Sequence, residues 1–237
     1  MLYYEKKLSL RVSDYDLRDR LAPSAVLDLF QFVATEHAER IGIGYKAMLE
    51  KNLFWVLVRC RYDVVKNPEY CSEITVKTWP REEGRIDYDR DYEITDEKGE
   101  LLVYGSSKWC VVNAATRRIA VNGEVRYSDR EFYGKAVYPD GLKKIKDFST
   151  DGFSSEKGRT TYSDLDHNGH VNNANYGKFV LNALRPDSEI KSFGIDFINE
   201  MSADSDYEVF FGKDEGKTKV KGVSDGKQNF RAEIDFG

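Results

Sequence analysis

The sequence has few of the residues that stabilise a fold through covalent bonds or metal ions. Its 237 residues include three cysteines, Cys60, Cys71 and Cys110, and three histidines. An odd number of cysteines without short, regular spacing favours neither a disulfide framework nor a cysteine-rich zinc site. Because each cysteine falls in or beside a strand-like pattern, we expect reduced thiols with a structural role. We predict no metal ion and no cofactor.

Long apolar runs are also absent. No stretch approaches the roughly 20 apolar residues that cross a bilayer. The first ten residues, MLYYEKKLSL, contain an acid and bases but no apolar signal segment. The formal net charge of −5 disfavours a general nucleic-acid binder, which needs a broad basic surface. We therefore expect a soluble cytoplasmic protein that binds neither nucleic acid nor a membrane.

The sequence does contain enough apolar material for a sizeable core, with 41% hydrophobic and 13% aromatic residues. Its length suits one large domain or two of about 110 to 120 residues. Residues 54–65 alternate, and their predicted apolar face is Phe54, Val56, Val58, Cys60, Tyr62 and Val64. Residues 86–95 alternate in the same way, with the apolar face Ile86, Tyr88, Tyr92 and Ile94, and residues 100–113 continue the series. Successive strands of this kind indicate an antiparallel sheet.

A predicted helix precedes these strands. Residues 23–42 begin with Pro23, which suits a first helical position, and end at Gly42. Their apolar stripe at helical spacing is Val26, Leu29, Phe30, Val33 and His37. A lone histidine on such a stripe is more often a core residue than a catalyst, so we place His37 in the core.

The second half of the chain repeats this order. Residues 12–30 and 162–180 align at an offset of 150, and the shared positions are Ser13 with Ser163, Asp14 with Asp164 and Asp16 with Asp166. The second copy continues into a helical stripe that Pro186 ends, and then into strand-like segments at 193–199, 207–212, 217–223 and 228–236. A helix followed by an antiparallel sheet, given twice, predicts an α+β protein of two like domains. We place them at residues 1–121 and 157–237, with a connector at 122–156 that is too long to be a simple turn.

The two copies differ in one polar loop. Residues 161–179 hold two of the three histidines and four of the eleven asparagines. A solvated turn that caps a helix would explain a polar loop. However, the first copy has Arg18 and Arg20 where the second has Asn168 and His170. Because only the second copy carries the imidazole and the amide, we interpret it as the functional copy and the first as one that has lost its catalytic residues.

Residues 164–176, DLDHNGHVNNANY, resemble the active-site segment of the acyl-acyl carrier protein thioesterases. Residues 78–85, residues 106–119 and the helix from Pro23 are also similar to that family, so the resemblance covers nearly the whole chain. It implies tandem hotdog domains, each an antiparallel sheet wrapped around a central helix. It also implies hydrolysis of the thioester between a fatty acyl chain and the phosphopantetheine arm of acyl carrier protein, which ends chain elongation.

The same resemblance implies a set of catalytic residues. Asp166, Asn168 and His170 match functional positions of the family, and Glu200 matches a later acidic position. Plant members of the family have a cysteine directly after that acid, whereas this sequence has Met201, which argues against a Cys–His mechanism. Hydrolysis then requires activated water, with Glu200 or His170 as the base. Glu200 as an ordinary turn acid is the alternative.

The residues after His170 suit stabilisation of the negative charge that develops on the thioester carbonyl. Val171, Asn172 and Asn173 lead into a helix, whose free amides and positive dipole end would face that oxygen. We expect Asn172 or Asn173 to cap the helix. We also expect Asp166 to orient the His170 ring.

Two further sets of residues carry weaker signals. By analogy with the family, the acyl channel would be lined by Val26, Phe30, Val33, Trp55 and Leu57, although ordinary core packing explains each of them. The candidate patch for an acidic carrier protein is Arg117, Arg118, Lys143, Lys144 and Lys146, and a solvated basic face explains these equally well.

Alternative functions stay open at this point. A hotdog thioesterase that acts on coenzyme A esters would recognise the same phosphopantetheine arm. A non-catalytic acyl-binding module would hold lipid without turnover. The oligomeric state, including a homodimer, the acyl chain length and its saturation are not specified by the sequence.

Overall fold

The computed structural model describes residues 1–121, 125–126 and 131–237. Residues 122–124 and 127–130 of the predicted connector lie outside the described residues. The chain forms two compact units. Unit 1 comprises Met1–Val12 and Leu29–Leu142, and unit 2 comprises Ser13–Asp28 and Lys143–Gly237.

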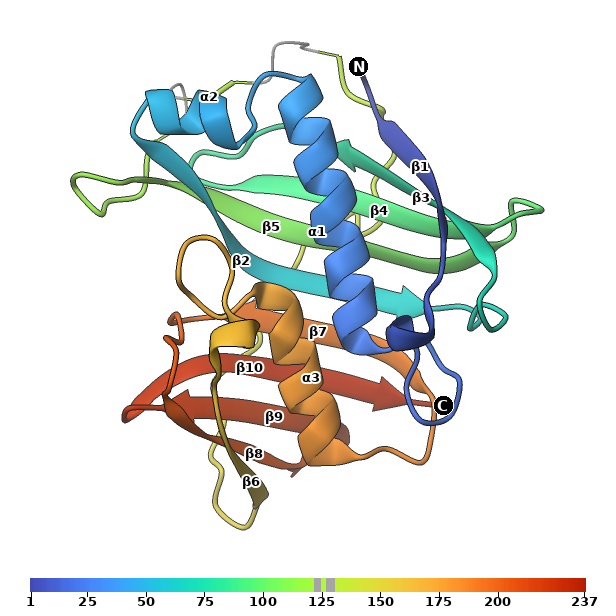
Figure 1. The fold of residues 1–237 in the computed structure, drawn as a ribbon, viewed down its shortest axis with the longest axis vertical. Helices are drawn as coiled ribbons and strands as arrows, with labels where there is room; N and C mark the ends of the chain where they lie inside the picture. Colours follow the sequence, from blue (N-terminus) through green and yellow to red (C-terminus); the bar gives the residue numbers. More distant parts are fainter. Residues whose placement is uncertain (122–124, 127–130) are drawn as a thin grey trace. The chain divides into compact units, whose positions relative to one another are not determined.

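Each unit contains a five-stranded antiparallel sheet (Figure 1). The strands of unit 1 are β1 (Tyr4–Ser9), β2 (Leu53–Val64), β3 (Glu73–Pro80), β4 (Tyr88–Asp96) and β5 (Leu101–Asn113). Those of unit 2 are β6 (Ser154–Arg159), β7 (Ile190–Phe197), β8 (Asp206–Asp214), β9 (Lys217–Ser224) and β10 (Lys227–Phe236). The order in unit 1 is β1-β3-β4-β5-β2, and the order in unit 2 is β6-β8-β9-β10-β7. The two sheets therefore have the same topology, which confirms the predicted repeat.

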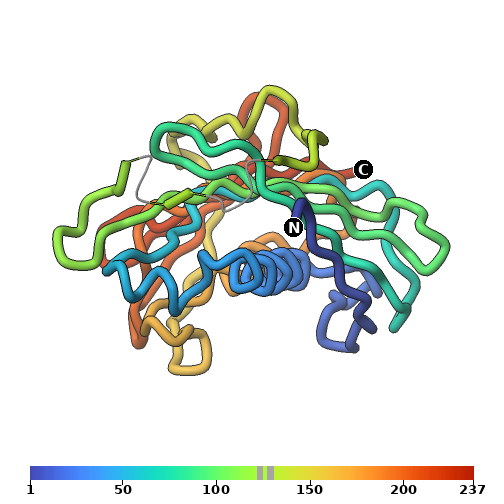
Figure 2. The backbone as a smooth tube through the Cα atoms, turned by 90° about the horizontal axis from the view of Figure 1, so that it is seen from above, coloured from blue at the N-terminus to red at the C-terminus, as the bar shows by residue number. Residues whose placement is uncertain are grey.

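The predicted long helix is α1, Pro23–Arg40, and a short helix that the sequence reading missed, α2, follows at Tyr45–Glu50. In unit 1, the ring of Phe30 on α1 stacks on Tyr92 of β4 with centroids 4.1 Å apart. Gly105 of β5 permits this approach, because a Cβ atom there would lie 2.6 Å from the Phe30 ring. Figure 2 shows α1 end-on, beneath the strands of unit 1. His37 is fully buried, as predicted.

The second predicted helix is α3, Asn173–Leu184. Its inward face packs on the unit 2 sheet, where Tyr176 meets Phe197 and Phe230 edge-on at 5.4 and 5.3 Å between centroids. The helix ends where Arg185 adopts a left-handed conformation with φ of 43°, directly before Pro186, which cannot continue a helix.

The alternation predicted for residues 54–65 is wrong in its first half. The pairing of β2 with β5 shifts register between Leu57 and Arg59, which is the signature of a β-bulge at Val58. A bulge adds one residue to one strand and so reverses the facing of the side chains beyond it. As a result Leu57 is buried before the bulge, Cys60 and Tyr62 are buried after it, and Val58 is only partly buried.

Ile86 was also placed wrongly. It precedes β4 and is 45% exposed, because the strand begins only at Tyr88. Strands β1, β3 and β6 were not predicted, and for β1 and β6 the reason is their position in the sheet. Each lies at one end of its unit's strand order, and an end strand with exposed or half-exposed side chains lacks the apolar alternation that marks a buried strand.

The described part of the 122–156 segment is more than a connector. In unit 1, the backbone amide of Val137 donates to Asp91 Oδ2 at 3.0 Å, and Arg59 Nη1 donates to the carbonyl of Leu142 at 2.8 Å. In unit 2, the amide of Ile145 donates to Asp196 Oδ2 at 3.0 Å. The segment therefore covers polar side chains of each sheet, and Asp91 is fully buried. Strand β6 also begins inside the predicted connector, at Ser154.

Candidate active site

The polar loop of the second repeat is built on its own backbone hydrogen bonds. A 3-10 turn at Tyr162–Asp164 opens it, with a capping box between Thr161 and Asp164. The amide of Asp166 donates to the carbonyl of His170 at 2.8 Å. Gly169 completes the turn with φ of +80°, a conformation that a residue without a Cβ adopts most easily. The loop thus holds the residues around His170 in one defined turn.

Asp166 organises this turn from inside. Its Oδ1 accepts the backbone amide of Asn168 at 2.8 Å, and its Oδ2 accepts the Asn168 side-chain amide at 3.3 Å. The amide of His170 lies 3.4 Å from Oδ1. Asp166 therefore positions the loop backbone and Asn168, whereas we had expected it to orient the His170 ring.

The partner of the His170 ring is Glu200, thirty residues further along the chain. Nε2 of His170 lies 3.2 Å from Oε2 of Glu200, and the two side chains are 37% and 55% exposed. Directly beside them, the amide of Val171 donates to the carbonyl of Met201 at 2.9 Å. This backbone bond joins the loop to the segment after β7, so the approach of the imidazole to the carboxylate follows from the main-chain pairing.

Two side chains that we had not predicted to act here hold the segment that carries Glu200. Asn229 of β10 is 2% exposed, and its side-chain amide donates to the carbonyl of Glu200 at 3.2 Å. The hydroxyl of Tyr176 hydrogen-bonds to the backbone of Met201. Burial raises the pKa of Tyr176, with smaller contributions from the charges of Glu200 and Asp166. The signal for Asn229 was a single asparagine inside an apolar strand.

The N-terminus of α3 follows the loop. Asn172 is the cap, as one of our two expectations had it, and its side chain accepts the amide of Ala174 at 2.9 Å. The expectation that three free amides precede the helix needs correction, because Val171 donates to Met201 and Asn172 donates to Asp164 at 2.8 Å. Of the three, the amide of Asn173 is the one without a hydrogen bond to any residue that the structure describes.

The corresponding loop of the first repeat has the same backbone hydrogen bonds, which form its frame, but carries different side chains. The amide of Asp16 donates to the carbonyl of Arg20 at 2.7 Å, and the amide of Ala22 donates to the carbonyl of Asp14 at 2.9 Å. These bonds match those of Asp166 and Asn172 at the offset of 150. The frame is therefore a property of the repeat, and the chemistry depends on the side chains that it carries.

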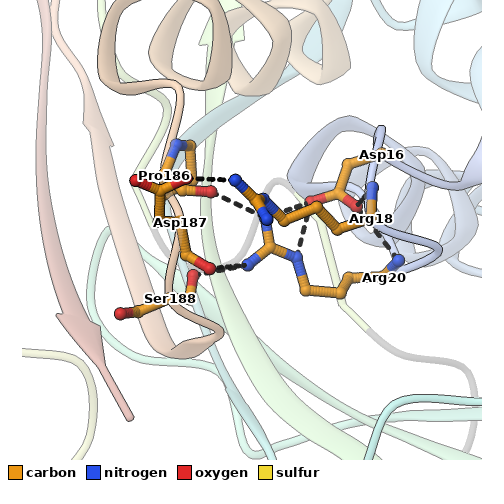
Figure 3. Close-up of polar contacts among 6 residues, drawn as sticks. All are labelled: Asp16, Arg18, Arg20, Pro186, Asp187 and Ser188. Carbon is orange, nitrogen blue, oxygen red and sulfur yellow. Dashed lines mark hydrogen bonds and ion pairs between the residues drawn. The ribbon is translucent and has the colours of Figure 1, made fainter.

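In this first copy the arginines form a structural clamp (Figure 3). Arg20 Nε donates to Asp16 Oδ2 at 2.8 Å, and its two terminal nitrogens donate to the carbonyls of Pro186 and Ser188 at 2.9 and 2.6 Å. Arg18 pairs with Asp187. All of these residues belong to unit 2. The loop of the first repeat thus binds the residues that directly follow α3.

The position of Glu200 is also changed in the first repeat. The amides of Leu10 and Thr160 donate to the carbonyls of Ser72 and Ser205, each at 3.0 Å, so Ser72 corresponds to Ser205. Five residues before Ser72 is Asn67, where the second repeat has Glu200. Neither the imidazole nor the carboxylate is present in the first copy.

The remaining predicted residues lie as follows. Val26, Phe30, Val33 and Leu57 are buried, and Trp55 is partly buried against a core cluster that includes Ile43 and Tyr88. The basic residues Arg117, Arg118, Lys143, Lys144 and Lys146 are exposed. The arginines belong to unit 1 and the lysines to unit 2. The lining of a channel and the carrier patch both stay predictions.

The cysteines are all free and all in unit 1. Cys60 and Cys110 are buried, and Cys71 is exposed. In the described ranges, no group of three His, Cys, Asp or Glu side chains is arranged to hold a metal ion. The same residues include no helix with the length and apolarity of a membrane span.

The class of the protein follows from the repeated sheet topology and from the loop of the second repeat, which carries His170. It is a tandem hotdog protein with a candidate acid–base site in its second repeat. The sequence model described as "Acyl-ACP thioesterase N-terminal domain" matches residues 1–128, and "Acyl-ACP thioesterase C-terminal domain" matches residues 149–237. The chain belongs to the acyl-ACP thioesterase family.

Individual relatives agree with this assignment. The chain is 28% identical over 221 residues to oleoyl-acyl carrier protein thioesterase 2 of Arabidopsis thaliana, a match that covers 85% of this chain and 60% of that protein. The chain spans between 47% and 62% of the length of the curated relatives that it matches.

Solved structures confirm the fold. An acyl-ACP thioesterase from Bacteroides thetaiotaomicron superposes with a TM-score of 0.88 at 24% identity, covering 99% of this chain and 98% of that one. The 12:0-ACP thioesterase of Umbellularia californica gives 0.85 at 22% identity, covering 100% and 98%.

Proposed function

We propose that the protein hydrolyses the thioester between a fatty acyl chain and the phosphopantetheine arm of acyl carrier protein, and releases a free fatty acid. The observation that carries the proposal is the approach of His170 Nε2 to Glu200 Oε2 at 3.2 Å, three residues before the first turn of α3. Membership of the acyl-ACP thioesterase family supports the choice of substrate.

The chemistry follows from the groups that the loop assembles. Glu200 and His170 are half-exposed, so water reaches both. Glu200 takes a proton from a water molecule as that water attacks the carbonyl carbon, and His170 holds the water or passes a proton to the departing sulfur. Asn168, fixed by Asp166, is a further side-chain donor.

The negative charge on the carbonyl oxygen requires a donor in the tetrahedral intermediate. The amide of Asn173 lies at the positive end of α3 and has no hydrogen bond to a described residue, which makes it the candidate donor. A pre-oriented amide of this kind is worth about 3 to 4 kcal/mol in the transition state. Thioester hydrolysis by this route uses water as the nucleophile and leaves no part for Met201, whose side chain is buried.

The test is the turnover of acyl carrier protein thioesters by His170→Ala. We expect kcat to fall roughly 100- to 10,000-fold with the melting temperature nearly unchanged, because the side chain is partly exposed. His167→Ala is the matched control, since it removes an exposed histidine of the same loop. Full activity of His170→Ala, or an equal loss in both variants, would contradict the assignment.

The substrate is tested separately. The wild-type protein should hydrolyse acyl carrier protein thioesters with a higher kcat/KM than coenzyme A thioesters of the same chain. Preference for the coenzyme A thioester would replace the proposed substrate, and retention of acyl chains without release would indicate a binding module. Mass analysis of the acids released from a panel of carriers would give the chain length.

A further inference from the structure

In the part of unit 1 that the structure describes, the buried guanidinium of Arg90 has no carboxylate partner. Arg90 of β4 is 5% exposed and lies between its strand and α1. Its Nη1 is 3.0 Å from His37 Nδ1 and 3.3 Å from Thr78 Oγ1. Both partners are neutral, because burial and the charge of Arg90 lower the pKa of His37 to about 3.

The carboxylates next to Arg90 in sequence point away from it. Successive side chains of a strand alternate between its two faces. Asp89 pairs with Lys108, with Oδ1 and Nζ 2.7 Å apart. Asp91 accepts the backbone amide of Val137, which belongs to the segment outside the sheet. The two acids that flank Arg90 therefore serve the opposite face.

Most of the donors of Arg90 are unused. A guanidinium has five N–H groups in a rigid fork, and the hydrogen bonds of Arg90 involve Nη1 alone. Nε and Nη2 make no hydrogen bond with any of the residues described in the structure. Neither atom is among the fully buried side-chain atoms that lack a hydrogen-bond partner, so both keep accessible surface from which they can donate to a ligand. A largely buried guanidinium without a carboxylate among the described residues is unfavourable, and a bound anion would offset that cost.

The fold itself does not require this cluster. Pro80 pairs with Arg90 in unit 1, and the equivalent pair in unit 2 is Lys213 with Thr218, so the second repeat has a neutral residue at the position of Arg90. Helix α1 has 18 residues and α3 has 12, and His37 lies in the part of α1 that has no equivalent. Arg90 and His37 thus have no counterpart in the second repeat.

We propose that Arg90, with His37 and Thr78, binds a carboxylate at the end of an aliphatic chain inside unit 1. A carboxylate fits because it accepts two parallel hydrogen bonds from the guanidinium fork and neutralises the buried charge. The aliphatic part follows from the surroundings. Tyr92 lies two residues along the same face of β4, and Val33 lies one turn before His37 on α1, and both are buried.

Two sources would supply this chemistry. One is a free fatty acid, whose only carboxylate would meet Arg90. The other is an acyl chain that carries a carboxylate at its far end. The second source rests on the proposed hydrolysis, and the first does not.

The binding test uses decanoate as the probe and 1-decanol as its neutral analogue, measured by calorimetry on the whole protein. Arg90→Met should weaken decanoate binding about tenfold to a hundredfold, as expected for a charged hydrogen-bonded pair, and leave 1-decanol unchanged. Arg90→Lys keeps the charge, loses the fork and should give an intermediate affinity. Arg117→Met, which removes an exposed arginine of the same unit, is the control.

The turnover test compares carrier thioesters of decanoic acid and of decanedioic acid, which differ only at the far end. If the acyl chain is the source, Arg90→Met lowers kcat/KM for the decanedioyl substrate tenfold or more and spares the decanoyl substrate. If a free fatty acid is the source, only decanoate binding changes. Arg90→Met with wild-type values in both tests overturns the proposal.

Two further measurements distinguish an effect on ligand binding from an effect on folding or on hydrolysis. We expect Arg90→Met to melt no lower than the wild type, because an apolar side chain of similar length replaces a buried guanidinium that has no carboxylate partner among the described residues. If it fails to fold, Arg90→Lys decides, and unchanged decanoate affinity in that variant counts against the proposal. A wild-type protein that binds decanoate through Arg90 but hydrolyses neither substrate refutes the proposed function and leaves this inference standing.

Discussion

Replacement of Glu200 by glutamine separates catalysis from stability at the candidate site. Glu200→Gln keeps the size of the side chain but removes its charge and its ability to take a proton. The carboxylate lies 3.2 Å from His170 Nε2, and the two side chains are 55% and 37% exposed. Water and salt therefore screen the pair, and its direct contribution to folding is small.

The two expected magnitudes are far apart. An exposed ion pair contributes about 0 to 1 kcal/mol to the free energy of unfolding. Loss of a general base lowers the rate roughly 100- to 10,000-fold, which corresponds to about 3 to 5 kcal/mol in the activation free energy. We therefore expect Glu200→Gln to lose most of its turnover while its unfolding free energy stays within about 1 kcal/mol of the wild type.

The assay is the release of fatty acid from an acyl carrier thioester across pH, together with denaturant unfolding. Glu156→Gln is the matched control, since Glu156 pairs with Arg185 at 3.1 Å with side chains 47% and 75% exposed, outside the loop. The control should keep full turnover. If Glu200→Gln keeps more than half of the wild-type kcat/KM at every pH, Glu200 is not the base and is an ordinary turn acid.

Three other predictions concern stability. Because folding lowers the pKa of His37 from 6.5 to about 3, only the unfolded chain takes up a proton between these values; unfolding free energy should fall by about 1.4 kcal/mol per pH unit below 6.5. His37→Phe should flatten that dependence in pH-resolved unfolding, and an unchanged slope would contradict it. Arg20→Met breaks an ion pair whose side chains are 12% and 9% exposed, and it should lower the free energy of unfolding by about 3 to 5 kcal/mol. Arg18 is more exposed, so Arg18→Met should lower it by about 1 kcal/mol or less. Equal losses of the two variants in denaturant unfolding would refute the clamp. Gly177→Ala would place a Cβ atom 2.7 Å from the backbone nitrogen of Ser24, and we expect a loss of about 1 to 3 kcal/mol, measured as a lower melting temperature. Wild-type stability of that variant would show that the two helices can separate there.

Local patterns in the sequence specify most of the secondary structure. The helical stripe from Pro23 is α1, and the stripe that Pro186 ends is α3. The turns after β8 and β9 have positive φ at Glu215 and Gly216 and at Asp225 and Gly226, as two-residue hairpins require. These elements depend on neighbouring residues, so the sequence is sufficient to predict them.

Features that depend on residues far apart in the sequence were not predicted. The bulge at Val58 exists because of the pairing with β5, and no local property of residues 54–65 marks it. The burial of Asp91 depends on a segment more than forty residues away, which donates the Val137 amide. Edge strands such as β6 have no buried face and therefore no alternation to detect.

The sequence by itself determined the repeat, helices α1 and α3 and the loop that carries His170, because these follow from local spacing and from comparison of one half with the other. Only the tertiary structure decided that Glu200 meets the imidazole, that Asp166 braces the backbone, and that Arg20 clamps the chain after α3. The physical reason differs between them. The contacts of Glu200 and of Arg20 depend on chain reversals through a sheet or helix, which bring together groups that no sequence spacing relates. The contact of Asp166 is local, but which neighbour the carboxylate meets depends on the conformation of the turn.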